Sequence, residues 1–160
     1  MIQHGQKTTI HCTRAIRALW PNPLAAQWIQ QYPDIFDRDD LRLATSQPRY
    51  HFCEWFAAIY LFHRDGAHSL VEQYVYQSHP AKVAQMAALI PEGARKMLDR
   101  IRKDCRVQLP DLLVSLPKTR DYWFAEVKDP RDRISEKQRK SHDAIGKELG
   151  VPVEIVEVKI

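Results

Sequence analysis

Residues 124–138 read FAEVKDPRDRISEKQ, and residues 109–114, a short way upstream, read LPDLLV. Each segment carries an acid beside apolar residues. Asp111 directly precedes the apolar residues 112–114, and Glu126, followed by Lys128, lies among the apolar residues at the start of segment 124–138. Carboxylate oxygens are the ligands that hard divalent cations prefer, and such cations promote attack of water on phosphate esters. The order of acid, acid and lysine is therefore typical of a magnesium-dependent phosphodiesterase.

A simpler interpretation of the same residues stays open. Side chains two positions apart share one face of a strand, so Glu126 and Lys128 are expected to project together. A lone Glu-x-Lys is also what an exposed strand end with a surface ion pair looks like. Asp111 follows a proline, and Pro-Asp is a frequent turn pair.

The composition of the 160 residues is that of one ordinary soluble domain, with 44% hydrophobic and 28% charged residues. The net charge of +4 permits a polyanionic partner without requiring one. Two segments, 95–106 and 128–140, concentrate the basic residues. From them we expect nucleic-acid contacts by Arg95, Arg102, Arg106, Arg131, Arg133 and Lys137.

The three cysteines (Cys12, Cys53 and Cys105) are isolated, and no Cys-x-x-Cys or Cys/His zinc spacing occurs. This favours reduced thiols over structural zinc or a disulfide framework. No apolar run reaches membrane-spanning length and no signal-peptide pattern opens the chain. We therefore expect a cytoplasmic protein, or a nuclear one in a eukaryote, with no membrane partner.

The order of the expected elements gives the fold class. Helical pieces over 13–31 are interrupted by Pro21 and Pro23, residues 37–40 form an acidic turn or helix start, and a stronger helix spans 50–64. Strand and helix compete over 68–77. Further on we expect helices over 80–89, 92–105 and 135–149, and strands over 107–116, 122–128 and 151–160. This is an α/β protein with a mixed sheet flanked by helices, and a helical N-terminal region.

The stretch from Glu126 to Gln138 resembles the VRR-NUC group of the PD-(D/E)XK nuclease superfamily. Members of that group read Pro-Asp-Leu, then Glu-Val-Lys-Gly-Pro, then Asp-Arg-Leu-Ser-x-x-Gln before a helix and a closing strand. The resemblance covers residues 107–158, with a weaker similarity upstream over 54–80. It implies a restriction-endonuclease-like fold and a DNA nuclease that uses Mg²⁺ or Mn²⁺.

The resemblance also implies roles for individual residues. Asp111, Glu126 and the main-chain carbonyl of Val127 would bind the metal, and Lys128 would orient the attacking water. Gln138 matches a glutamine that faces the site, although it is also the third residue of a capping box and could serve only there. An upstream helix would add a carboxylate, for which we choose Glu54 over the competitor Glu72.

One residue departs from the family pattern: Asp129 stands where glycine is usual. Aspartate tolerates unusual backbone angles, and here it also adds a carboxylate beside the site. By domain, we expect a helical extension over 1–47 packed on a nuclease domain over 48–160, in one compact unit. The resemblance further implies branched or structured DNA as substrate and homodimer formation. The alternatives are a nucleic-acid-binding module without turnover and a nuclease that acts on RNA.

Overall fold

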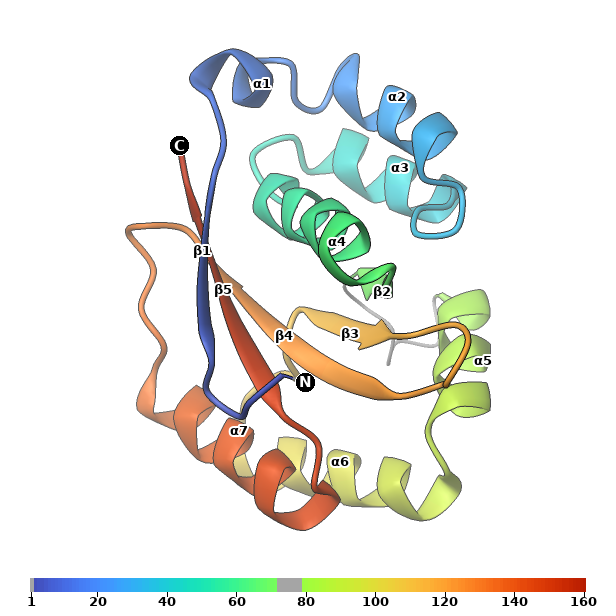
Figure 1. Ribbon diagram of the computed structural model, residues 1–160, viewed down its shortest axis with the longest axis vertical. Coiled ribbons are helices and arrows are strands. Elements are labelled where there is room, and N and C mark those ends of the chain that lie inside the picture. Colours follow the sequence, from blue (N-terminus) through green and yellow to red (C-terminus); the bar gives the residue numbers. More distant parts are fainter. Residues whose placement is uncertain (1, 72–78) are drawn as a thin grey trace.

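The computed structural model describes residues 2–71 and 79–160 and is built around one mixed sheet (Figure 1). Its strands are β1 (Lys7–His11), β2 (His68–Val71), β3 (Leu112–Ser115), β4 (Tyr122–Lys128) and β5 (Val153–Lys159). They lie in the order β1-β5-β4-β3-β2. The first three in that order run parallel, whereas β3 is antiparallel to both β4 and β2. The expected mixed α/β sheet flanked by helices is confirmed.

Helices cover both faces of this sheet. The helices are α1 (Arg14–Ala18), α2 (Leu24–Gln31), α3 (Arg38–Ser46), α4 (Phe52–Asp65), α5 (Pro80–Leu89), α6 (Glu92–Cys105) and α7 (Glu136–Leu149). In Figure 1, α2, α3 and α4 lie on one side of the sheet, with α6 and α7 on the other. Over the described ranges, no helix is long and apolar enough to cross a membrane.

An aromatic cluster joins the N-terminal helices to α4. Trp20 lies 5.0 Å from Trp55 and 5.9 Å from Trp28 between ring centroids, and Phe36 stacks on Trp55 at 4.0 Å. All three tryptophans are buried. Buried aromatic rings each remove a large apolar area from water. The N-terminal helices therefore share one hydrophobic core with the sheet.

The helix ends follow the signals in the sequence. Ser135 caps α7 in a capping box with Gln138, and Gly150 closes that helix with φ of 67°. Gly66 closes α4 in the same left-handed conformation, which glycine adopts without a steric penalty. The acidic segment 37–40 proves to be a helix start, because Asp37 and Asp40 form a second capping box at α3.

The structure differs from the sequence-based prediction in three places. Strand β1 was not expected, since residues 1–47 were predicted to be helical; it pairs in parallel with β5, Lys7 opposite Ile155. Strand β3 begins at Leu112 rather than near residue 107, after Pro110, which has no amide hydrogen for a ladder. The ambiguous stretch over 68–77 is a strand as far as Val71, and its remainder lies outside the described residues. The division at residue 47 stays a prediction.

Two buried ionic clusters tie the helices to the sheet. Lys82 of α5 donates hydrogen bonds to Asp40 of α3 and to the carbonyl of Val71 in β2. On β5, Glu154 is fully buried and ion-paired with Arg64 of α4. Its carboxylate also accepts hydrogen bonds from the side chains of Thr8 and Trp123, at 2.8 and 3.3 Å. Buried charges are tolerated only when they are paired in this way.

Candidate active site

Asp111 lies where strands β3 and β4 separate. Its Oδ2 accepts a hydrogen bond of 2.8 Å from the main-chain amide of Val127. The register pairs Leu112 with Ala125, so this bond extends the contact between the two strands by one step beyond the residue at which β3 begins. The side chain thereby replaces a missing main-chain acceptor, and its position relative to the end of β4 is fixed.

Glu126 and Lys128 project from the same face of β4, as the strand periodicity predicted. Lys128 Nζ lies 2.8 Å from Glu126 Oε1. This is not an exposed surface pair, because Glu126 is only 3% exposed. The interpretation as an ordinary exposed strand end therefore does not describe these residues.

Helix α7 supplies two further contacts to Glu126. Gln138 Nε2 donates to Glu126 Oε1 at 2.7 Å, and His142 Nε2 lies 3.6 Å from Glu126 Oε2. Gln138 also completes the capping box, with its Oε1 accepting from the Ser135 amide at 3.0 Å. Gln138 therefore contacts Glu126 and completes the capping box at once, because the two ends of its amide group serve different partners.

His142 was not expected at the site. It is buried, and it follows Gln138 by four residues, so the two side chains lie on one face of α7. The spacing of four from Gln138 was the signal that would have identified it.

The electrostatics of the site are dominated by crowded carboxylates. Burial raises the pKa of Asp111 well above its usual range, and the negative charges of Glu126 and Glu54 raise it further. Burial acts on Glu126 in the same direction, but hydrogen bonds from His142 and Lys128 outweigh it and hold the pKa of Glu126 below normal. Burial alone would lower the pKa of Lys128, yet its ion pair with Glu126 keeps that pKa above normal. Lys128 is thus a cation at neutral pH.

A recess of about 570 Å³ opens beside these carboxylates. It lies between the first turn of α4, the end of β4 with the loop that follows, and residues from the N-terminal region. We call it the N-terminal recess; its lining includes Arg17, Arg49, Tyr50, Glu54, Val127 and Arg131. The sequence interpretation did not anticipate Arg17, Arg49 or Tyr50 here.

Glu54 and the loop residue Asp129 both line the recess. The Glu54 carboxylate is close enough to Asp111 to raise its pKa, whereas Glu72 lies outside the described residues. Asp129 Oδ1 accepts hydrogen bonds from the amides of Arg131 and Asp132, at 2.7 and 3.2 Å. The aspartate in place of glycine therefore stabilises the loop, and its own φ is not positive.

The six basic residues expected to contact nucleic acid fall into two groups. Arg131 lines the recess, and Arg133 and Lys137 are exposed on the same loop and at the start of α7. On α6, Arg95 donates to the Ile90 carbonyl and Arg102 to Asp99, while Arg106 caps the end of the helix. Of the six, only Arg131 lines the recess together with Glu54 and Val127.

The donor set suits a hard cation. Asp111, Glu126 and Glu54 supply carboxylate oxygens, and the pKa of Asp111 is raised first by burial and then by the negative charges of Glu126 and Glu54, which a divalent cation would offset. Within residues 2–71 and 79–160, however, no three His, Cys, Asp or Glu side chains form a ready-made metal-binding group. A cation here would rely on two carboxylates together with a main-chain oxygen.

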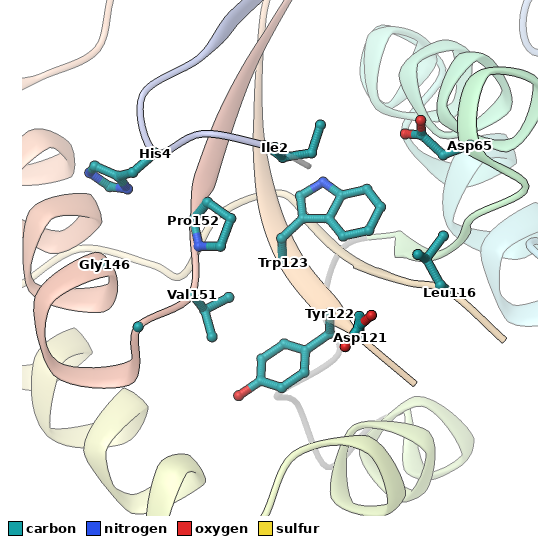
Figure 2. A pocket seen from close by; sticks show the side chains of 11 residues that line it. Ile2, His4, Asp65, Leu116, Asp121, Tyr122, Trp123, Gly146, Val151 and Pro152 are labelled. Carbon is teal, nitrogen blue, oxygen red and sulfur yellow. The ribbon is translucent and has the colours of Figure 1, made fainter. Parts of the chain in front are cut away.

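A second cavity, of about 660 Å³, lies elsewhere in the fold. It opens at the start of β4, beside Tyr122 and Trp123, with Pro152 and Val151 from the approach to β5 and His4 from the N-terminal segment (Figure 2). Its lining is mainly apolar and contains none of the site carboxylates. We therefore assign the candidate active site to the opposite end of β4, beside the N-terminal recess, although that recess is the smaller of the two cavities.

Comparison with known proteins agrees with this geometry. The model of the VRR-NUC domain matches residues 52–160, a range that includes Glu54, Asp111, Glu126, Lys128, Gln138 and His142. That domain is a nuclease family of the PD-(D/E)XK superfamily, so it indicates a nuclease-type function with DNA as substrate. A search of curated proteins found no match to the chain.

Proposed function

The chain belongs to the VRR-NUC domain family, and on that premise we propose that it is a divalent-metal-dependent DNA endonuclease acting on branched or structured DNA. The observation that carries the proposal is the cluster at the end of β4. There Asp111 is held by the Val127 amide, and Glu126 is held by Lys128 and Gln138.

Mg²⁺ or Mn²⁺ would be held by Asp111, Glu126 and the main-chain carbonyl of Val127, with Glu54 as a further carboxylate. When bound, the cation would polarise the scissile phosphate and offset the charge that develops on it. The position of Asp111 supports this assignment, because its buried carboxylate lies near the negative charges of Glu126 and Glu54, which a dication would offset.

The chain's own side chains would orient the reaction. Lys128 carries a positive charge at neutral pH, so it would act by positioning the attacking water and stabilising negative charge on the phosphate, not by removing a proton. Gln138 and His142 would fix the orientation of the Glu126 carboxylate. Preorganised groups of this kind need no rearrangement during the reaction.

The basic loop would contact the DNA backbone. Arg131, Arg133 and Lys137 follow β4 directly, and Arg131 lines the N-terminal recess. Arg95, Arg102 and Arg106 on α6 would add weaker contacts. A homodimer with two sites would suit cleavage of two strands of a branched substrate, and we place the activity in the cytoplasm.

The test is cleavage of matched flap, four-way-junction and linear duplex DNA with Mg²⁺, Mn²⁺ or EDTA. Glu126→Gln and Lys128→Met should abolish cleavage while the fold is retained. The matched controls are Glu92→Gln and Lys96→Met, which alter an exposed ion pair on α6 and should cut normally.

Cleavage that persists in EDTA, or in Glu126→Gln, would refute the mechanism. A protein that binds DNA with a steep salt dependence but cuts nothing would instead be a non-catalytic binding module. Matched RNA substrates in the same assay separate a ribonuclease from a deoxyribonuclease.

A further inference from the structure

Three arginines from separate parts of the chain meet in the N-terminal recess. Arg17 comes from α1, Arg49 from the segment before α4, and Arg131 from the loop after β4. The first two lie outside the region that matches the nuclease family, which begins at residue 52. Residues outside the family match therefore line the recess next to the candidate active site.

Neither Arg17 nor Arg49 is ion-paired with a carboxylate in the part of the chain that the structure describes. Arg17 instead lies over the Phe52 ring, 4.9 Å from its centroid. By contrast, Arg64 is ion-paired with Glu154, and Arg102 with Asp99. Half-buried or exposed guanidinium groups without a carboxylate partner suit the phosphates of a polyanion.

Tyr50 at the edge of the recess is unusually exposed. At 67%, it is the most exposed of the large apolar side chains in the described ranges. Its backbone is nevertheless fixed, because the buried Trp20 donates from Nε1 to the Tyr50 carbonyl at 3.0 Å and the Tyr50 amide bonds to Gln47. The next residue, His51, has φ of 76° and is the N-cap of α4. A held backbone with an uncovered ring is a preformed stacking surface.

The recess also contains acids. Glu54 and Asp129 lie with Val127 near the proposed metal ligands, whereas Arg17, Arg49 and Tyr50 belong to the N-terminal side. A strand of DNA would place its scissile phosphate beside Glu54 and its neighbouring phosphates on the arginines. An aromatic ring beside arginines is the combination by which proteins bind single-stranded nucleic acid.

We propose that the N-terminal recess binds an unpaired segment of the DNA substrate, with Tyr50 stacking on a base and Arg17 and Arg49 contacting the adjacent phosphates. This deepens the proposed nuclease function and rests on it for the orientation of the strand. It assigns the first 50 residues a role in substrate selection: DNA with unpaired nucleotides next to the cleavage site is preferred over continuous duplex.

The proposal is tested by binding in EDTA, where no cleavage competes. Fluorescence anisotropy would compare a single-stranded oligonucleotide with a blunt duplex of the same sequence. The variants are Tyr50→Ala, Tyr50→Phe, the double variant Arg17→Gln with Arg49→Gln, and Arg42→Gln as a control on an exposed arginine of α3 outside the recess lining. Thermal unfolding confirms that each variant is folded; the Tyr50 carbonyl that binds Trp20 is kept in both Tyr50 variants.

We expect Tyr50→Ala to weaken single-strand binding by about 10-fold or more and to leave duplex binding nearly unchanged. Tyr50→Phe and Arg42→Gln should bind like wild type. The double arginine variant should flatten the dependence of log K on log salt by about 1.4, since each lost phosphate contact contributes about 0.7 on single strands.

The proposal is overturned if Tyr50→Ala binds the single strand as wild type does, or if Tyr50→Phe is as weak as Tyr50→Ala. Cleavage assays separate this result from the proposed function. If the wild-type protein cuts DNA and the recess variants bind and cut normally, only the proposal that the recess binds unpaired DNA is disproved. If binding depends on Tyr50 but the protein cuts nothing in Mg²⁺ or Mn²⁺, the proposal for the recess stands and the proposed nuclease function is disproved.

Discussion

The side-chain amide of Gln138 joins the start of α7 to the carboxylate of Glu126. Its Nε2 donates to Glu126 Oε1 at 2.7 Å, and its Oε1 accepts from the Ser135 amide at 3.0 Å. One residue thus determines where the helix begins and how the glutamate on the neighbouring strand is oriented. Stability and activity should therefore respond differently to different substitutions at this position.

Gln138→Glu separates the two roles. Glutamate retains an oxygen for the Ser135 amide but loses the donor to Glu126 and adds a like charge beside it. We expect stability within about 1 kcal/mol of wild type and a loss of at least about 10-fold in kcat/KM, the value of a hydrogen bond to a charged group. Gln138→Ala should lose both contacts, and therefore both stability and activity. Urea unfolding and cleavage kinetics check this; equal stability loss in the two variants would contradict it.

Asp111→Asn should remove activity without unfolding the protein. The asparagine oxygen can still accept from the Val127 amide. Because burial and the charges of Glu126 and Glu54 raise the pKa of Asp111, its ionised form costs stability at neutral pH when no cation is bound. In EDTA the variant should melt at or above the wild-type Tm.

Added Mg²⁺ should raise the Tm of wild type and not that of Asp111→Asn, while cleavage falls at least about 100-fold. Asp104→Asn, on the exposed side of α6, is the matched control and should respond like wild type. Equal stabilisation of Asp111→Asn by Mg²⁺ would remove Asp111 from the metal site.

The buried pair of Asp40 and Lys82 predicts a pH effect on stability. Burial raises the pKa of Asp40 to about 6, although Lys82 partly opposes the shift. A carboxyl group whose pKa is higher in the folded state favours folding when protonated, and this contribution disappears as pH rises through the folded pKa. Relative to Asp40→Asn, wild type should lose up to about 3 kcal/mol between pH 4 and pH 7. Urea unfolding across that range measures it; a difference independent of pH would contradict the assignment.

The cluster around Glu154 predicts a large stability effect. Glu154→Ala would leave Arg64 without its buried carboxylate, so the free energy of unfolding should fall by about 3–5 kcal/mol. The double variant with Arg64→Ala should cost less than the sum of the two single changes. Glu148→Ala breaks a more exposed pair with Arg100 and should cost less than about 1 kcal/mol. Additive losses would show that the two side chains are not coupled.

The sequence was sufficient to predict those elements and candidate residues whose signal lies within a short stretch of the chain. Asp111, Glu126, Lys128 and Gln138 belong to short motifs with fixed spacing, and the capping box and Gly150 identified the ends of α7. By contrast, Arg17, Arg49 and Tyr50 reach the site only through the packing of α1 and α4, and no spacing along the chain relates them to β4. Proximity between residues far apart in the sequence depends on how the hydrophobic core packs, which no short stretch of sequence shows.

Strand β1 escaped prediction for a different reason. Its sequence, KTTIH, is polar at most positions, and only Ile10 is buried. An edge strand needs little apolar surface, because one side of it faces solvent and its pairing comes from the backbone. The β-branched residues Thr8, Thr9 and Ile10 were a weak signal that the helical context outweighed.

The parallel pairing of β1 with β5 also sets the order in which the molecule is completed during synthesis. Lys7 and Ile155, which face each other in the sheet, are separated by almost the whole length of the chain. At translation rates of 5–20 residues per second, β1 waits about 7–30 s for its partner. During that time Thr8 has no Glu154 to bind, whereas the aromatic cluster of Trp20, Trp28, Phe36 and Trp55 lies wholly within the early part of the chain. Strand β5 is the one that completes the pairing of β1.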